Sequence, residues 1–358
     1  MAERRQTSFR ERIRRALSND VGIDLGTVNT LVYVKGRGVV ISEPSVVAIN
    51  QKTGAVVAVG RDAKDMLGRT PTHITAVKPV VEGVISDFEV TEEMISYLLS
   101  RAQEGHKKIL GPRVVVGVPS GITDVETRAV RDACQNAGAS EVHIVEEPIA
   151  AAIGMRLPVK DPVGSMVIDI GGGTTDIAVI SLSGIVRSKN IRIAGDAFDD
   201  NIVSYVRNEF KVLIGHKSAE EVKIAIGSVM QDDEGAEAVV RGRDLVTGLP
   251  REVAVTDADI REAIGASIGT IVEGAREVLE TTPPEILSDV MHRGVNIAGG
   301  GALFRGLPEL LEHELRIPIH VPPDPLLAVV RGCAAILDDI DYWQDILLVN
   351  EDEISPVS

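Results

Sequence analysis

The sequence contains two stretches that align without a gap: Val21-Gly-Ile-Asp-Leu-Gly-Thr-Val-Asn-Thr-Leu-Val-Tyr-Val34 and Met166-Val-Ile-Asp-Ile-Gly-Gly-Gly-Thr-Thr-Asp-Ile-Ala-Val179. The alignment places Asp24 on Asp169. In each stretch, β-branched residues flank a reversal centred on glycine, a pattern that predicts a strand, a tight turn and a second strand. Because the two copies lie far apart in the chain, the repeat predicts two domains built on one plan.

Both turns carry the groups that polyphosphate binding requires. Glycine lets the backbone approach phosphate oxygens because it has no Cβ, and backbone N–H groups with the hydroxyls of Thr27 and Thr174 supply donors. Asp24 and Asp169 stand at the strand ends, where a carboxylate can hold a hydrated Mg²⁺. A single Asp-x-Gly-Thr is more often an ordinary hairpin turn. Two aligned copies favour a phosphate site that uses both.

Strands and helices alternate in the rest of the first half. Apolar runs at Val114–Pro119 and Val142–Val145 predict buried strands, and Thr123 or Asp124 can cap a helix between them. The inward stripe of that helix is expected at Val125, Ala129, Cys134 and Ala137. Such alternation predicts α/β layers.

A third glycine cluster joins a strand to a helix in the second half. Val295–Ala298 reads as the strand, Leu307–Leu315 as the helix, and Gly299, Gly300, Gly301 and Ala302 stand between them. Glycines there allow the backbone to lie against a ligand, and a helix N-terminus favours negative charge. A tight turn without a ligand is the alternative interpretation.

A candidate catalytic carboxylate follows the strand that ends near residue 145. Glu147 precedes Pro148, and a carboxylate fixed in this way could orient a water for attack on a γ-phosphate. The alternative is an acid favoured by the helix dipole. A dinucleotide fingerprint is excluded because Asp176 stands where glycine is needed, and Gly215-His-Lys-Ser218 lacks the glycine spacing of a Walker motif.

Composition limits the class of protein. The chain has 358 residues, of which 44% are hydrophobic and only 3% aromatic, so about two domains with aliphatic cores are expected. The formal charge of −16 argues against nucleic acid as a partner, because binding to phosphates needs clustered Lys and Arg. Cys134 and Cys333 lack any spacing typical of zinc sites and are expected to be buried thiols in a reducing compartment.

The N-terminus differs from the rest of the chain. Residues 1–18 carry a net charge of +4, which leaves −20 for the remainder. Phe9, Ile13 and Leu17 are spaced by four residues among arginines, which predicts a basic amphipathic helix that lies on a membrane. A disordered Arg-rich tail is the alternative. No apolar run reaches the length of about 18 residues that spans a bilayer, and no signal peptide is recognisable.

These motifs resemble those of a known superfamily, the actin, Hsp70 and sugar-kinase ATPases, whose order they follow. The shared motifs are Asp24-x-Gly-Thr27, Pro119-Ser-Gly-Ile-Thr-Asp124, Glu147-Pro148, Asp169-x-Gly-Gly-Gly-Thr174, Ala219-Glu-x-x-Lys223 and Gly299-Gly-Gly301. The local sequence over about residues 19–345 most resembles the bacterial actin homologue MreB, for example in Gly83-Val-Ile-Ser-Asp87 and Gly301-Ala-Leu-Phe-Arg-Gly306. Val28 and Val80-Val81-Glu82 depart from the family's usual residues.

The resemblance implies an actin-like ATPase fold: two related domains of RNase H type, each with a smaller inserted subdomain, and ATP or ADP with Mg²⁺ in the cleft between them. The implied subdomains are IA (residues 19–39, 73–152 and 323–350), IB (40–72), IIA (153–188 and 252–322) and IIB (189–251). A basic amphipathic N-terminal segment (1–18) precedes them and an acidic tail (351–358) follows them. The implied site residues are Asp24 and Asp169 for Mg²⁺, Glu147 and Thr174 for the hydrolytic water, and Thr27, Val28, Asn29, Gly171, Gly172, Gly173, Thr174, Glu220, Glu221, Val222, Lys223, Gly299, Gly300, Gly301 and Ala302 for the nucleotide.

The resemblance also implies a role. Proteins of this kind are slow ATPases that form filaments on the inner face of the cytoplasmic membrane and determine cell shape by organising peptidoglycan synthesis, with partners such as MreC, MreD and RodZ. Ile109 and Leu110 stand where the family carries an apolar pair that inserts into the membrane. A small-molecule kinase or a chaperone-type ATPase of the same superfamily is the alternative. A kinase would need a catalytic Asp with an acceptor pocket, and a chaperone would need a substrate domain.

Overall fold

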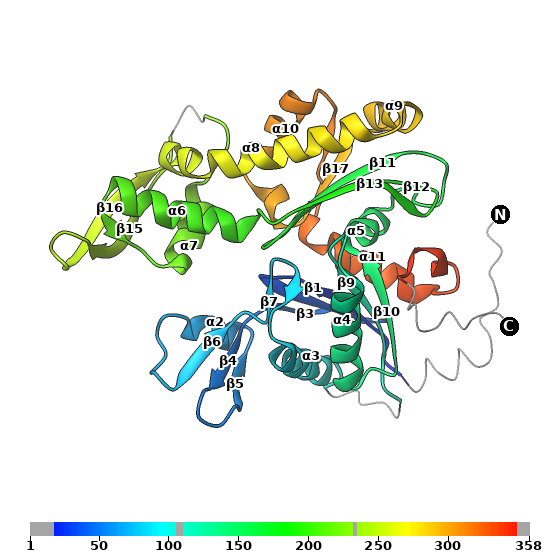
Figure 1. Cartoon of the computed structure of the whole chain (residues 1–358), viewed down its shortest axis with the longest axis horizontal. Coiled ribbons are helices and arrows are strands. Elements are labelled where there is room, and N and C mark those ends of the chain that lie inside the picture. Colours follow the sequence, from blue (N-terminus) through cyan, green and yellow to red (C-terminus); the bar gives the residue numbers. More distant parts are fainter. Residues whose placement is uncertain (1–17, 105–109, 232–234, 349–358) are drawn as a thin grey trace. The chain divides into compact units, whose positions relative to one another are not determined.

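The computed structural model describes residues 18–104, 110–231 and 235–348, and its chain divides into two compact units (Figure 1). Unit 1 comprises the described parts of Met1–Val118, Ile122–Glu146 and Val329–Ser358. Unit 2 comprises those of Pro119–Gly121 and Glu147–Ala328. Phe9, Ile13, Leu17 and Ile109, which we assigned to membrane contact, lie outside the described residues.

Each unit is built around a five-stranded sheet. In unit 1 the order is β10-β9-β1-β2-β3, and in unit 2 it is β13-β12-β11-β17-β18. The strands of unit 1 are β1 (Val21–Leu25), β2 (Asn29–Val34), β3 (Gly38–Pro44), β9 (Arg113–Val118) and β10 (Glu141–Glu146). The strands of unit 2 are β11 (Ser165–Ile170), β12 (Thr175–Ser181), β13 (Gly184–Ile191), β17 (Val295–Ala298) and β18 (Ile319–His320).

The two sheets share one topology. In both, the first three strands form an antiparallel meander and the last two strands lie parallel to the first. The repeated stretches occupy equivalent hairpins, since Leu25 pairs with Thr30 in one and Ile170 with Thr175 in the other. The α/β class and the repetition of one plan are therefore confirmed. The central strands are buried on both faces, which explains their unbroken runs of Val and Ile.

Helices cover these sheets, and local capping residues determine where a helix begins. Unit 1 has α2 (Arg61–Met66), α3 (Phe88–Ala102), α4 (Asp124–Asn136) and most of α11 (Ala328–Asp338). Thr123, one of the two caps that the sequence allowed, caps α4, and it does so in a capping box with Glu126. The expected inward stripe of α4 was partly wrong. Val125 is 78% exposed, while Val130, Ala133 and Cys134 face the core. The reason is that packing against α3 determines which side of α4 is buried.

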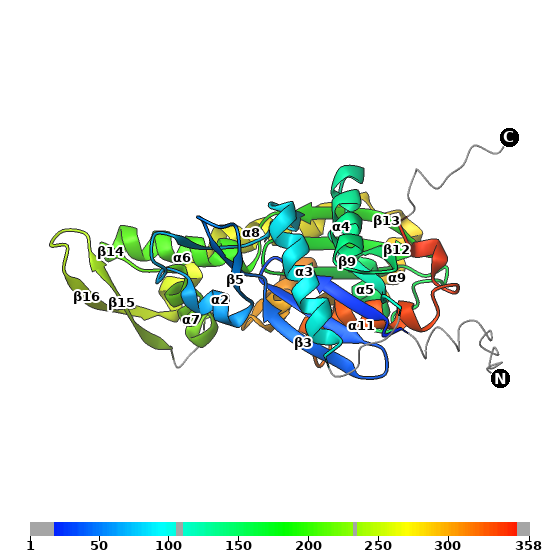
Figure 2. The same ribbon diagram turned by 90° about the horizontal axis from the view of Figure 1, so that it is seen from below.

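The other α-helices of the described residues belong to unit 2. They are α5 (Glu147–Gly154), α6 (Gly195–Glu209), α7 (His216–Ile226), α8 (Asp257–Thr281), α9 (Pro284–Arg293) and α10 (Leu307–Leu315), with 3₁₀ turns η1 (Gly300–Leu303) and η2 (Pro325–Leu327), and η3 (Gln344–Ile346) in unit 1. The long helix α8 packs along β12 and β13 (Figure 2). β17 and α10 have the bounds expected from the sequence.

Each unit also carries a smaller sheet inserted after its third strand, before α3 in unit 1 and between α6 and α8 in unit 2. The insert of unit 1 contains β4 (Val47–Asn50), β5 (Val56–Val59) and β6 (Ile74–Val77), followed by the hairpin of β7 (Val80–Val81) and β8 (Val84–Ile85). The insert of unit 2 contains β14 (Val212–Leu213), β15 (Glu237–Asp244) and β16 (Pro250–Thr256). No helix in the described parts of the chain is long and apolar enough to cross a membrane.

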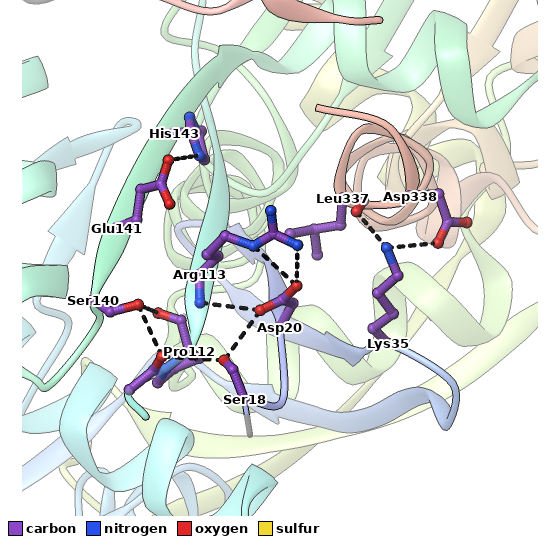
Figure 3. Close-up of polar contacts among 11 residues, drawn as sticks. Ser18, Asp20, Lys35, Pro112, Arg113, Ser140, Glu141, His143, Leu337 and Asp338 are labelled. Carbon is purple, nitrogen blue, oxygen red and sulfur yellow. Dashed lines mark hydrogen bonds and ion pairs between the residues drawn. The ribbon is translucent and has the colours of Figure 1, made fainter. Parts of the chain in front are cut away.

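At two points, a helix belongs to the other unit than the chain segment that precedes it. α5 follows β10 of unit 1 but packs on β11 and β12 of unit 2. Most of α11 follows unit 2 in sequence but belongs to unit 1, where the Cys333 thiol donates to the backbone oxygen of Ile23. Lys35 fastens the end of α11 by donating to the Leu337 carbonyl and pairing with Asp338 (Figure 3).

Candidate nucleotide-binding site

The turn of unit 1 between β1 and β2 is held by the neighbouring strand β3 and its end. The Ser45 hydroxyl donates to the Gly26 carbonyl at 2.5 Å, and the Ser45 N–H donates to the Val28 carbonyl at 2.9 Å. A Cβ on Gly26 would lie 2.6 Å from the Asn29 carbonyl oxygen, so only glycine fits this reversal. Ser45, which the sequence reading did not single out, thus fixes the backbone of the turn.

Thr27 is buried within the same turn and is held by a second hairpin. Its hydroxyl oxygen accepts a hydrogen bond from the Gly83 N–H at 3.0 Å. Gly83 and Glu82 both have positive φ in the turn between β7 and β8, as two-residue hairpin turns require. A hydroxyl that accepts one hydrogen bond can still donate its proton, so Thr27 keeps a donor for a ligand. The segment that departs from the family pattern therefore lies directly before the residue that supports Thr27.

The two candidate metal ligands occupy equivalent places. Asp24 and Asp169 are each the penultimate residue of a central strand, β1 or β11. Burial raises the pKa of Asp24 to about 7. No group of three metal-ligating side chains occurs in the described residues. Mg²⁺ fits one or two carboxylates, because it keeps several waters and takes phosphate oxygens as further ligands.

The glycine turn of unit 2 is ordered by the start of α6. The Gly171 N–H donates to the Thr174 carbonyl at 2.9 Å, which closes the turn. The N–H groups of Gly195 and Asp196 donate to the carbonyls of Gly171 and Gly172 at 3.3 and 2.8 Å. These bonds use N–H groups that a helix start leaves without helical partners, and they fix the orientation of the turn's peptide planes.

Lys223 of α7 reaches this turn. Its ammonium donates to the Gly195 carbonyl at 2.9 Å and forms an ion pair with Asp199 at 2.9 Å. Burial raises the pKa of Asp199 to about 6, although Lys223 opposes this shift. Of the neighbouring candidates on α7, Val222 is buried in the core of unit 2, whereas Glu221 is exposed.

The third glycine cluster packs against the end of β11. A Cβ on Gly299 would lie 2.3 Å from the Ile170 carbonyl oxygen and 2.4 Å from Oδ1 of Asp169, and one on Gly301 would lie 2.2 Å from Cγ2 of Ile170. The same segment is joined to α7, because Arg305 donates to the Gly227 carbonyl at 3.1 Å. Unit 2 therefore brings together Asp169, the glycine turn, Lys223 and Gly299–Ala302.

The candidate catalytic residues both belong to unit 2. Glu147 begins α5, which packs on β11 and β12, and Thr174 is buried at the end of the glycine turn. The sequence reading missed three further polar residues of this unit, Ser120, Asp176 and Asn190. Ser120 lies in the shared Pro119–Asp124 motif, but no local pattern indicates that it contacts Asp176 and Asn190, because these side chains meet only in the folded chain.

The family model described as MreB/Mbl protein matches residues 18–345. The chain belongs to the MreB/Mbl family. It is 50% identical over 335 residues to the cell shape-determining protein MreB of Escherichia coli (strain K12), covering 92% of this chain and 96% of the relative. It is 46% identical over 325 residues to the cell shape-determining protein Mbl of Bacillus subtilis (strain 168), covering 90% and 97%.

Solved structures share the fold described above. MreB 5 of Spiroplasma citri bound to AMPPNP superposes with a TM-score of 0.86 at 38% identity, covering 91% of this chain and 97% of that chain. A MamK double helical filament has the same fold, with a TM-score of 0.77 at 22% identity, covering 90% and 99%. The actin-like fold expected from the sequence is thus confirmed.

Proposed function

We propose that this member of the MreB/Mbl family binds one ATP with Mg²⁺ through the glycine turns of both units and hydrolyses it slowly. The observation that carries the proposal is the convergence in unit 2 of a carboxylate, a glycine turn, a lysine and a second glycine cluster around the end of β11. Crystal structures show MreB5 of Spiroplasma citri bound to ADP and to AMPPNP, which supports nucleotide binding by this chain.

Each group has a chemical role in this proposal. Asp24 and Asp169 would hold the hydrated Mg²⁺, which would supply charge compensation for the phosphates. Glu147 and Thr174 position the hydrolytic water, because phosphoryl transfer depends mainly on positioning and electrostatics. The residues that would bind the phosphates are Thr27, Val28, Asn29, Gly171, Gly172, Gly173 and Thr174. Those that would bind the ribose and base are Glu220, Glu221, Val222, Lys223, Gly299, Gly300, Gly301 and Ala302.

We further propose that the protein assembles with copies of itself into filaments that organise peptidoglycan synthesis during elongation. The names of the Escherichia coli and Bacillus subtilis relatives support a role in cell shape. A contact between unlike surfaces that does not close into a ring generates a filament, so a single such contact is sufficient. MreC, MreD and RodZ are the partners that this role implies.

We propose that the protein acts at the inner face of the cytoplasmic membrane. The Ser18 hydroxyl donates to the Gly111 carbonyl at 3.1 Å, within the polar network around Asp20 and Arg113 (Figure 3). The point where residues 1–17 join the described chain therefore lies beside Leu110, which is 44% exposed. Two apolar elements that start from one place can enter the same bilayer, and a filament adds the avidity of many copies.

Electron microscopy of the purified protein with and without ATP tests the filament. Filaments that form only with nucleotide would support the proposal, and their absence with every nucleotide and lipid would contradict it. Sedimentation with vesicles that contain anionic lipid tests the membrane. We expect removal of residues 1–17 and Leu110→Ser each to reduce co-sedimentation, whereas Val246→Ser, which changes an exposed residue of unit 2, should leave it unchanged. Equal sedimentation by all the variants would reject the anchor.

A further inference from the structure

Three residues between β9 and α4 belong to unit 2, although the chain on both sides of them belongs to unit 1. The chain leaves unit 1 after Val118, and it returns at Ile122. Pro119–Gly121 opens the Pro119–Asp124 motif that the sequence shares with the superfamily, yet the nucleotide site described above gives that motif no role. The side chain that holds the three residues to unit 2 is Asp176.

Asp176 is a buried acceptor surrounded by donors. It is 1% exposed on β12. Its Oδ1 accepts from the Ser120 N–H at 2.8 Å and from the Ser120 hydroxyl at 2.5 Å, and Asn190 donates to both carboxylate oxygens at 3.0 Å. Burial raises the pKa of Asp176, and hydrogen bonds from Ser120, Asn190 and Thr174 oppose that shift. Burial of a carboxylate costs free energy unless hydrogen-bond donors compensate for the lost water, so Asp176 needs all of these donors in place.

The carboxylate is connected to the proposed catalytic group. Asp176 stands directly opposite Asp169 in the pairing of β11 with β12, and it follows Thr174 by two residues at the same turn, where Thr174 is one of the hydrogen-bonding groups that lower its pKa. A threonine hydroxyl has one proton and two lone pairs. A Thr174 hydroxyl that donates its proton to Asp176 keeps its lone pairs to accept a hydrogen bond from a water.

We propose that Asp176 is a positioning residue for ATP hydrolysis, which orients the Thr174 hydroxyl toward the attacking water and holds Ser120 and its loop at the same turn. This inference rests on the proposed ATPase function. Asp176 affects the rate of the chemical step, because it acts on the water only through Thr174. Its contact with the β11–β12 turn lies within unit 2.

The test compares nucleotide affinity with the hydrolysis rate in the full-length protein. We expect Asp176→Asn to lower the single-turnover rate of ATP hydrolysis by about 10-fold or more, because small misplacements of catalytic groups cost up to about 100-fold. Affinity for ATP, measured by titration calorimetry, should change by less than about threefold, since interactions made only in the transition state affect the rate alone. Ser120→Ala should slow hydrolysis in the same direction, and Ser120→Thr, which restores a hydroxyl, should recover the rate.

Matched controls come from the same unit. Ser267 is a buried serine whose hydroxyl accepts from Asn201, and Asp257 is a buried carboxylate that pairs with Arg261, so Ser267→Ala and Asp257→Asn should leave the rate unchanged. If Asp176→Asn does not fold, the two Ser120 variants decide. Hydrolysis at the wild-type rate by the folded variants, or a parallel loss of affinity and rate, would overturn the inference. If the wild-type protein neither binds nor hydrolyses ATP, the proposed function fails with it.

Discussion

Replacing Gly299 with alanine should damage both the stability and the ligand site of unit 2. Gly299 has φ 78° and ψ 178°, a region of backbone space that is essentially restricted to glycine. An alanine Cβ would lie 2.3 Å from the Ile170 carbonyl oxygen and 2.4 Å from Oδ1 of Asp169, about an ångström inside ordinary contact. Neither neighbour is the free end of a long side chain, so the strain cannot be relieved cheaply.

The expected magnitude follows from these two costs. Such a backbone conformation costs a non-glycine residue about 1–3 kcal/mol, and overpacking of a buried site costs about 1–3 kcal/mol more. We therefore expect Gly299→Ala to lower the free energy of unfolding by about 3 kcal/mol. Gly265 of α8 is the matched control. A Cβ there meets nothing within 4 Å, so Gly265→Ala should stabilise by about 0.5–1 kcal/mol through helix propensity.

Urea denaturation followed by circular dichroism measures both changes. Calorimetric titration with Mg²⁺-ATP measures the second consequence, because displacement of the Asp169 carboxylate should also weaken nucleotide binding. The packing of the third glycine cluster against β11 would be refuted if Gly299→Ala were as stable as the wild-type protein. It would also be refuted if Gly299→Ala and Gly265→Ala changed stability in the same direction by the same amount.

Two further substitutions test the electrostatics. Because burial raises the pKa of Asp199 to about 6 against the opposing effect of Lys223, the folded state holds the proton more tightly. Stability should then fall by up to about 3 kcal/mol as the pH rises from about 4 to 6, and Asp199→Asn should remove this slope in denaturation at each pH. Burial would raise the pKa of Asp20, but Arg113 outweighs it and holds the pKa low. Asp20→Asn should cost about 3–5 kcal/mol at pH 7, whereas Glu252→Gln at an exposed pair should cost less than about 1 kcal/mol.

Local patterns were sufficient to predict the framework. The hairpins of β1–β2 and β11–β12, the strand β17 and the helix α10 all follow from β-branched runs, glycine turns and apolar periodicity, which are encoded within each segment. The start of α4 was also predictable to within one residue, because Thr123 and Asp124 are both typical caps, although the sequence left open which of them serves. Burial of Val125 was predicted wrongly, since the phase of an amphipathic helix depends on which neighbour it packs against.

The supporting contacts of the candidate site could not be predicted from the sequence. Ser45 and Gly83 support the first turn from separate hairpins, and Asp199 holds Lys223 from a different helix. Ser120 and Asp176 are 56 positions apart. No spacing rule connects such residues, because their approach depends on the sheet register and on the three-residue passage of the chain into unit 2.

The most direct test of the account is a crystal structure of the protein with Mg²⁺ and a non-hydrolysable ATP analogue. The expected result is a single triphosphate in contact with Thr27 of one unit and Gly172 of the other, with the cation held through water and phosphate between Asp24 and Asp169. A nucleotide bound by only one of the glycine turns, or bound at any other place on the chain, would contradict the account.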